Sequence, residues 1–453
     1  MPVATETTEA PAVAAPRPAP AFSVSKGIEQ ITFRRAGFAN AIEGTTTGML
    51  SLNAYVALKA MGGEAAGYEA ELSTLVTMLP SVAMLFASAY NGGGTVRRRR
   101  RYFIFAGVFG RLVFLLVPLL ALLPGALTPF AFVMLVGFSA LICAGVPPAL
   151  NQLWGANYIP ASRGKRFALL SSISMLMVMV SAWVAGRFLD AAPLLDGFQN
   201  YQFMYPAAAL SGAIALFTFY SIRMRYAAAI EAAEVRGTHP LKRLVRAYGR
   251  AYRLLRRDRN FLQYEAGFFL YGIAFMMLLP AVPVLFSRTL HADYSDFSQA
   301  TVVTVQCSLM LIVPVVAWLA KGRRVTVVTA AAYLALVLYP AALGVTALTH
   351  TLAFAYVAFA LFGIAMAGVH FVWNLGPVSF ARGGNPLPYT STHTSLVGAR
   401  ALFGFPLGYL LMKLFPDTLL PIFGGAVGLL LVAAGIMIHL DQRMRRQGLN
   451  QSA

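Results

Sequence analysis

Apolar residues are gathered along the chain in long blocks that are separated by short polar turns. Twelve blocks have about 20 residues, the length of α-helix that crosses ~30 Å of hydrocarbon. They lie at about 36–60, 71–91, 102–123, 130–154, 166–189, 204–224, 264–287, 300–320, 326–348, 352–376, 392–414 and 418–439. The pattern therefore predicts an all-α polytopic membrane protein with twelve transmembrane helices.

The two halves of this pattern share short sequence matches in the same order. Residues 74–81 resemble 301–308 at an offset of 227, residues 36–38 match 266–268 at 230, and Asn151 matches Asn374 at 223. Slowly drifting offsets between halves of similar hydropathy indicate an internal duplication. We therefore expect two pseudo-symmetric six-helix bundles, at 31–224 and 263–440, with a pathway between them.

The remaining segments are expected to lie outside the bundles. Residues 1–30 are rich in Ala, Pro, Thr and Glu and predict a disordered cytoplasmic tail, and 441–453 form a second cytoplasmic tail. Residues 225–262 alternate apolar and arginine positions at helical spacing, which predicts a basic amphipathic linker lying on the anionic cytoplasmic leaflet. Such a helix also fits a calmodulin-like partner or nucleic acid; the surface linker is the favoured interpretation.

Composition excludes a soluble globular protein and charge positions set an orientation. The chain is 58% hydrophobic and 12% charged, with mean hydropathy +0.66 and a net charge of +19. Of the 36 lysine and arginine residues, 30 lie in the tails and turns on one side, which is the positive-inside pattern and not a nucleic-acid surface. We expect a monomer in the cell inner (cytoplasmic) membrane with both termini cytoplasmic. Cys143 and Cys307 lie inside apolar blocks, so no disulfide or metal framework is predicted.

Basic turns after the second and eighth blocks complete a familiar arrangement. Arg97–Arg101 follow the second block, Gly322-Arg323-Arg324 follow the eighth, and the long basic linker divides the helices six and six. This architecture resembles the major facilitator superfamily over residues 30–440. The resemblance implies two rocking bundles, with the first, fourth, seventh and tenth helices lining a central cavity.

Four ionisable residues lie inside predicted helices, where a charge costs several kcal/mol unless it faces a cavity or a partner. They are Glu43, Arg111, His370 and Arg400, at similar depths. Asn40, Glu43, Thr47 and Ser51 form a polar stripe on the first helix, which must face protein or water. We consider two interpretations: Glu43 couples transport to protons and Arg400 binds a substrate anion, or Glu43 pairs with Arg400 or Arg111 to hold helices together.

Other polar residues suggest a gate and peripheral contacts. His370 and Asn374 share a helix face with Trp373 beside them, and the duplication places Asn151 and Trp154 opposite. These four, Asn151, Trp154, Trp373 and Asn374, are candidate inner-gate residues, and His370 is either a proton carrier or a packing residue. Arg187 and Asp190 are expected to pair or bridge loops, and Glu265 to be solvated at a helix lip.

Catalytic signatures are lacking from the sequence. No phosphate-binding loop, HExxH motif, GxSxG elbow or cysteine cluster occurs, so no enzyme activity and no cofactor are predicted. The leading hypothesis is a secondary transporter that moves a small organic solute, with proton coupling. The alternative is a non-transporting scaffold or assembly factor of the same fold.

Overall fold

The computed structural model describes residues 26–85, 96–158, 160–224, 249, 251–381 and 387–448, and no strand occurs among them. The helices of the first half are α1 (Lys26–Leu50), α2 (Asn53–Lys59), α3 (Glu69–Ala83), α4 (Val96–Leu112), η2 (Val113–Leu122), α5 (Thr128–Cys143), α6 (Val146–Asn157), α7 (Pro160–Asp190) and α8 (Tyr201–Ser221). Those of the second half are α11 (Arg259–Val284), η3 (Leu285–Thr289), α12 (Tyr294–Ser298), η4 (Gln299–Thr304), α13 (Val305–Ala320), α14 (Val325–Thr349), α15 (Leu352–Ser379), α16 (Leu387–Leu414) and α17 (Leu420–Arg446).

The predicted all-α membrane fold is confirmed. Among the described residues, ten helices are long and apolar enough to cross a membrane. The other two predicted spans are 36–60, which corresponds to α1 followed by α2, and 71–91, whose first part is α3 and whose end lies outside the described residues. The chain is therefore a multi-pass membrane protein.

Proline positions explain a break inside one predicted span. The fourth span is divided into α5 and α6, and Pro147-Pro148 lie in the first turn of α6. Proline is tolerated there because the first helical N–H groups have no intrahelical acceptor. By contrast, Pro280 and Pro283 lie within α11, which continues as an α-helix to Val284 before a π-helical turn.

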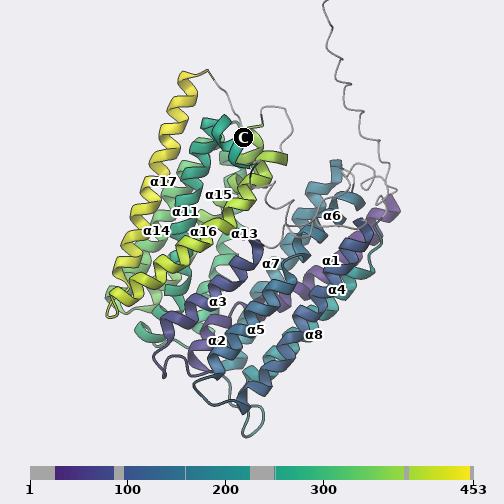
Figure 1. Cartoon of the computed structure of the whole chain (residues 1–453), viewed down its shortest axis with the longest axis vertical. Helices are drawn as coiled ribbons and strands as arrows, with labels where there is room; N and C mark the ends of the chain where they lie inside the picture. The colour runs from purple at the N-terminus through teal and green to yellow at the C-terminus, as the bar shows by residue number, and fades with distance from the viewer. Residues whose placement is uncertain are drawn as a thin grey trace, which may run out of the picture.

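Each half of the chain packs mainly with itself (Figure 1). In the first half α1 packs against α7 and α8, and α4 packs against α5 and α8. In the second half α11 packs against α16 and α17, and α14 against α15 and α17. The sequence matches fall on equivalent helices: residues 36–38 and 266–268 on α1 and α11, 74–81 and 301–308 on α3 and the η4–α13 helix, and Asn151 and Asn374 on α6 and α15.

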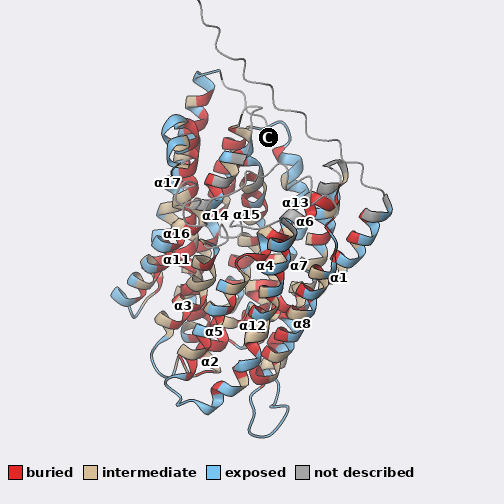
Figure 2. Cartoon of the chain, turned by 45° about the vertical axis from the view of Figure 1, so that its right-hand side comes forward, coloured by how far each residue is buried: buried red, intermediate tan, exposed pale blue. Residues whose placement is uncertain are grey.

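Burial follows the expected inside-out pattern of a membrane protein. Large apolar side chains such as Leu122, Leu311 and Trp318 are more than 70% exposed. Figure 2 shows exposed residues along the outer sides of the bundle and at its ends. A bilayer can cover this apolar surface, which water cannot do without cost.

One end of the bundle carries most of the arginines, and we call it the arginine-rich end. Arg34 is near the start of α1, Arg98–Arg101 begin α4, Arg259 begins α11, and Arg443–Arg446 end α17. The predicted linker lies mostly outside the described residues, but residues 251–257 are helical and directly precede α11. The lower part of Figure 1 is the opposite end, where α2 lies and α3 begins.

Hydrogen bonds and ion pairs join the two halves at this opposite end, which we call the closed end. The Asp190 carboxylate at the end of α7 accepts hydrogen bonds from the backbone N–H groups of Tyr294 and Ser295, at 2.9 and 2.7 Å. The Ala292 carbonyl accepts from Tyr55 Oη at 2.5 Å and Lys59 Nζ at 2.7 Å. Asp190 therefore bridges the halves, one of the two roles predicted for it.

Further contacts across the closed end come from α3. Ser73 Oγ donates to the Pro280 carbonyl at 2.6 Å, and Glu71 pairs with Lys413 Nζ at 2.5 Å. Residue 186 is a glycine because a Cβ there would lie 2.9 Å from the Tyr294 carbonyl oxygen. Helices α7 and α12 thus approach each other too closely for any side chain.

At the arginine-rich end, several polar side chains of the described residues have partners within their own half. In the first half Asn157 Nδ2 donates to the Arg223 carbonyl at 2.9 Å, and Ser162 Oγ donates to Glu29 at 2.8 Å. In the second half Asp441 accepts from Thr326 Oγ1 at 2.8 Å and pairs with Arg445 at 2.7 Å. Figure 1 shows the helices of the two halves diverging toward this end.

Candidate functional site

Glu43 on α1 and Arg111 on α4 form an ion pair inside the first half. Their side chains are 22% and 18% exposed, so the pair is largely removed from solvent. Arg111 was one of the two partners predicted for Glu43. A carboxylate and a guanidinium can share an apolar helix interface because each offsets much of the other's desolvation cost.

Small residues make room for this pair. A Cβ at Gly212 on α8 would lie 2.9 Å from Arg111 Cδ, so only glycine allows the arginine stem to cross that helix. Thr46 and Ser211 hydrogen-bond beside it at 2.9 Å and join α1 to α8. Three helices, α1, α4 and α8, therefore fix the position of the pair.

The rest of the polar stripe on α1 bonds to its own helix. Asn40 Nδ2 donates to the Ala36 carbonyl at 2.8 Å, Thr47 Oγ1 to the Glu43 carbonyl at 2.9 Å, and Ser51 Oγ to the Gly48 carbonyl at 2.6 Å. Asn40 is half-buried and Thr47 is exposed. Their remaining capacity to hydrogen-bond is available on the accessible side of α1.

Arg400 on α16 lies in an aromatic cage in the second half. Its guanidinium carbon is 5.4 Å from the ring centre of Phe268, 5.6 Å from Tyr271 and 5.1 Å from Trp373. Nη1 donates to the Phe268 carbonyl at 3.0 Å, and the residue is 4% exposed. Cation–π contacts of this kind stabilise a desolvated guanidinium by up to ~2 kcal/mol each.

Glu265 and His393 form a buried pair that the sequence did not predict. The Glu265 Oε1 and Oε2 atoms lie 2.9 and 3.1 Å from His393 Nδ1, and each residue is 3% exposed. Solvation of Glu265 was therefore the wrong expectation. Helix α11 begins at Arg259, so Glu265 is already in the second turn and faces α16.

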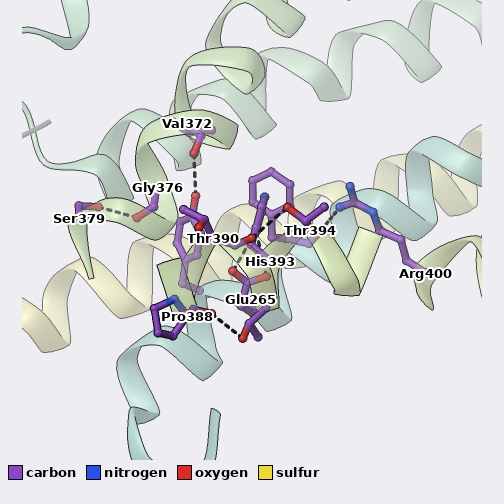
Figure 3. A network of polar contacts seen from close by, with 12 residues as sticks. Glu265, Val372, Gly376, Ser379, Pro388, Thr390, His393, Thr394 and Arg400 are labelled. Carbon is purple, nitrogen blue, oxygen red and sulfur yellow. Dashed lines mark hydrogen bonds and ion pairs between the residues drawn. The ribbon is translucent and has the colours of Figure 1, made fainter. Parts of the chain in front are cut away.

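The pair and Arg400 belong to one group of residues, the C-half cluster of Glu265, His393 and Arg400 (Figure 3). Phe268 lies 4.5 Å from His393 between ring centres, and Trp373 lies 4.9 Å from it. Both rings also contact Arg400, so they connect the three polar residues through aromatic contacts. Among the described residues, His393 Nε2 and Arg400 Nε are buried atoms without a hydrogen-bond partner.

The predicted residues therefore fall into two places and not one. Glu43 meets Arg111 within the first half, while Arg400 meets Phe268, Tyr271 and Trp373 within the second, so Glu43 and Arg400 do not form a pair. His370 is exposed on α15. These contacts do not bring the four ionisable residues into a single cluster.

The candidate gate residues lie on α6 and α15. Asn151 is exposed, whereas Trp154 is buried and stacks on Tyr158 with 5.8 Å between ring centres. Trp373 packs on Phe268 at 5.5 Å. The side chain of Asn374 lies outside the described part of the chain. Both tryptophans thus contact residues of their own half in this conformation, and the gate stays a prediction.

The described part of the chain contains no candidate metal site. No group of three or more His, Cys, Asp or Glu side chains there is placed to hold a metal ion. The polar residues described above are charge pairs, aromatic cages and helix caps, which can bind solutes and exchange protons.

Comparison with known proteins decides the family. The profile of the Major Facilitator Superfamily matches residues 37–385. The chain belongs to the Major Facilitator Superfamily. This membership supports a secondary transporter rather than an enzyme, and it confirms the resemblance seen in the sequence.

Solved structures of Major Facilitator Superfamily transporters share the fold. A D-xylose-proton symporter matches with a TM-score of 0.65 at 12% identity, over 91% of this chain and 97% of that one. A POT family transporter in complex with 5-aminolevulinic acid matches at 0.66 and 13%, over 92% and 96%. The nucleoside transporter NupG matches at 0.58 and 12%, over 91% and 98%. No curated protein matches the sequence.

Proposed function

We propose that this protein is a secondary active transporter that moves a small organic solute across the cytoplasmic membrane by alternating access. The observation that carries the proposal is the asymmetry between the two ends of the bundle. Asp190, Tyr55 and Ser73 bond across the halves at the closed end. At the arginine-rich end Asn157 and Asp441 bond within their own halves. Two bodies joined at one end are suited to rocking.

The arginine-rich end is the cytoplasmic end in this proposal. The excess of Lys and Arg on that side supports the orientation, because basic loops are retained on the cytoplasmic side during insertion. Both termini are then cytoplasmic, since α1 starts and α17 ends there. In this proposal the halves separate at the cytoplasmic end while they stay joined at the outer end.

Proton coupling is assigned to a carboxylate inside the bundle. Glu265 and His393 are the stronger candidates, because a carboxyl and an imidazole at 2.9 Å can share and release one proton with little rearrangement. Glu43 is the second candidate, and release of its proton would be coupled to its ion pair with Arg111. Glu43 lies on α1 and Glu265 lies on α11, which are the first long helices of the two halves.

Arg400 and its surroundings support a proposal for the substrate class. A buried guanidinium surrounded by Phe268, Tyr271 and Trp373 suits an anionic group on a flat or amphiphilic body. The structural relatives named for D-xylose, nucleosides and 5-aminolevulinic acid support a small organic solute in general.

Transport by the purified full-length protein in lipid vesicles tests the proposal. A panel of small carboxylated and aromatic solutes is offered with and without an inwardly directed proton gradient, in which the outside is more acidic. Uptake is compared with that of vesicles that lack the protein. We expect at least one solute to accumulate several-fold only with the gradient. Failure of every solute to move in either direction, by a protein that is folded in the vesicles, would favour the scaffold alternative.

A further inference from the structure

Two adjoining cavities lie at the arginine-rich end of the second half, where α11, α15, α16 and α17 end or begin. The first has a volume of about 510 Å³ and is lined by residues that include Arg257, Asn260, Phe380 and Tyr389. The second, of about 430 Å³, lies over Leu262 and Ala266. Arg259 and Arg443 line both, so the two cavities are neighbours, and we treat them as one site.

This site is strongly positive. The first cavity is lined by Arg257, Arg259 and Arg443. The second cavity is lined by Arg256 and again by Arg259 and Arg443. The one carboxylate among the lining residues is Asp258, the N-cap of α11. Its oxygens already accept from Asn260 N, Phe261 N and Tyr389 Oη. Four arginines therefore line the site, with one carboxylate that is engaged in capping.

Asn260 adds an unsatisfied acceptor. It is 7% exposed, and its Nδ2 donates to Gln447 Oε1 at 3.0 Å. Its Oδ1 is buried and, among the described residues, has no hydrogen-bond partner. An unsatisfied buried carbonyl oxygen costs free energy, so this site favours a bound molecule that supplies a donor. The ligand should thus carry both an anionic group and a hydroxyl or ammonium donor.

The second cavity provides an apolar track. Leu262 and Ala266 are four residues apart on α11, so they share one helix face, and Leu262 is 44% exposed. That face continues along a helix of 26 residues that is apolar enough to span the bilayer. A ligand that fills both cavities is polar at one end and apolar at the other.

We propose that this site binds an anionic membrane phospholipid with a hydroxyl-bearing head group, of the phosphatidylglycerol class. Arg259 and Arg443 recognise the phosphate, because guanidinium groups form charge-assisted hydrogen bonds to phosphate. A head-group hydroxyl donates to Asn260 Oδ1, and an acyl chain follows Leu262 and Ala266. The bound lipid connects α11 to α17 and is independent of the transported solute.

Lipid titration of the purified full-length protein tests the site. Delipidated protein in detergent is titrated with phosphatidylglycerol, phosphatidylcholine or inorganic phosphate, and bound lipid is counted by native mass spectrometry. Two variants are compared with wild type: R259Q/R443Q, which removes the phosphate contacts, and R34Q/R446Q, which removes the same charge from exposed positions outside the site. Asn260→Ala is measured as a third variant.

We expect phosphatidylglycerol to bind at least tenfold more tightly than phosphatidylcholine. R259Q/R443Q should weaken that binding tenfold or more, and Asn260→Ala several-fold, while R34Q/R446Q should have little effect. Equal binding of phosphatidylcholine, equal loss in R34Q/R446Q, or displacement of the lipid by millimolar inorganic phosphate would each overturn the proposal. The last result would indicate a site for a soluble anion.

Discussion

His393 Nδ1 lies 2.9 Å from Glu265 Oε1, across the interface of α16 and α11, and neither side chain is accessible to solvent. Removing one member of a buried hydrogen-bonded pair leaves the polar group of the other unsatisfied, which typically costs about 1–3 kcal/mol. A pair at such a position therefore either fixes the packing of two helices or exchanges a proton. The two roles have different consequences for transport.

The Glu265→Gln variant should distinguish the packing role of this pair from the proton-exchange role. Glutamine keeps the size and the acceptor oxygen but cannot release a proton at neutral pH. We expect accumulation driven by a pH gradient to fall at least tenfold in vesicles, while exchange of labelled for unlabelled solute without a gradient is retained. Asp196→Asn is the matched control, because it makes the same change from carboxylate to amide at an exposed position in the loop after α7. Equal loss of both activities in Glu265→Gln would assign a packing role.

The Glu43–Arg111 pair is tested with a double-mutant cycle. Glu43→Gln and Arg111→Gln each strand a largely buried charge, so each should destabilise the protein by up to about 3–5 kcal/mol. The double variant should recover part of that loss, because no charge is left unpaired. Thermal unfolding in detergent measures the stability. Transport that also recovers in the double variant would limit the pair to a structural role; transport that stays absent would support coupling by Glu43.

Gly272 should be required for the position of Arg400. A Cβ at residue 272 would lie 2.6 Å from Arg400 Nη1 and even closer to the side-chain stem. Gly272→Ala should therefore displace the guanidinium from its cage, destabilise the fold by about 1–3 kcal/mol through overpacking, and reduce transport at least tenfold. Gly424→Ala provides the control, since no atom lies within 4 Å of its added Cβ. Uptake assays on the two variants would refute the idea if both behaved like wild type.

Asp190 should hold the closed end together. Asp190→Ala removes two charge-assisted hydrogen bonds to the N–H groups of Tyr294 and Ser295, so the closed end should open more often and the arginine-rich end should close. Spin labels at Arg34→Cys and Gln442→Cys, with Cys143 and Cys307 replaced by alanine, report the distance between halves. We expect a new population at shorter distance. An unchanged distance distribution would show that Asp190 does not control this equilibrium.

The helical architecture could be predicted because lipid imposes a simple rule on sequence. A helix in hydrocarbon must be apolar over its whole exposed length, so blocks such as 326–348 are close to the observed α14, Val325–Thr349. The duplication could also be predicted, because it is a property of the sequence itself. Neither depends on how distant side chains meet.

The site could be predicted only in part, because its contacts join distant residues. Glu43 and Arg111 were recognised because a charge in an apolar block is conspicuous, and their pairing was one of two alternatives. Glu265 and His393 are separated by 128 residues and lie near predicted helix ends, where hydropathy does not distinguish a solvated group from a buried one. The cage of Arg400 is made of aromatic residues, which are common in membrane helices and give no signal of their own.

The position of Asp190 has a consequence for the folding of the helix that it contacts. Asp190, and not the preceding Asp293, satisfies the first N–H groups of α12, so the short helix is capped by a residue from the other half. Each separation of the closed end then leaves the first turn of α12 uncapped and prone to fray. The rate of amide hydrogen exchange at Tyr294 and Ser295 should accordingly report how often the closed end opens during the transport cycle, without an attached probe.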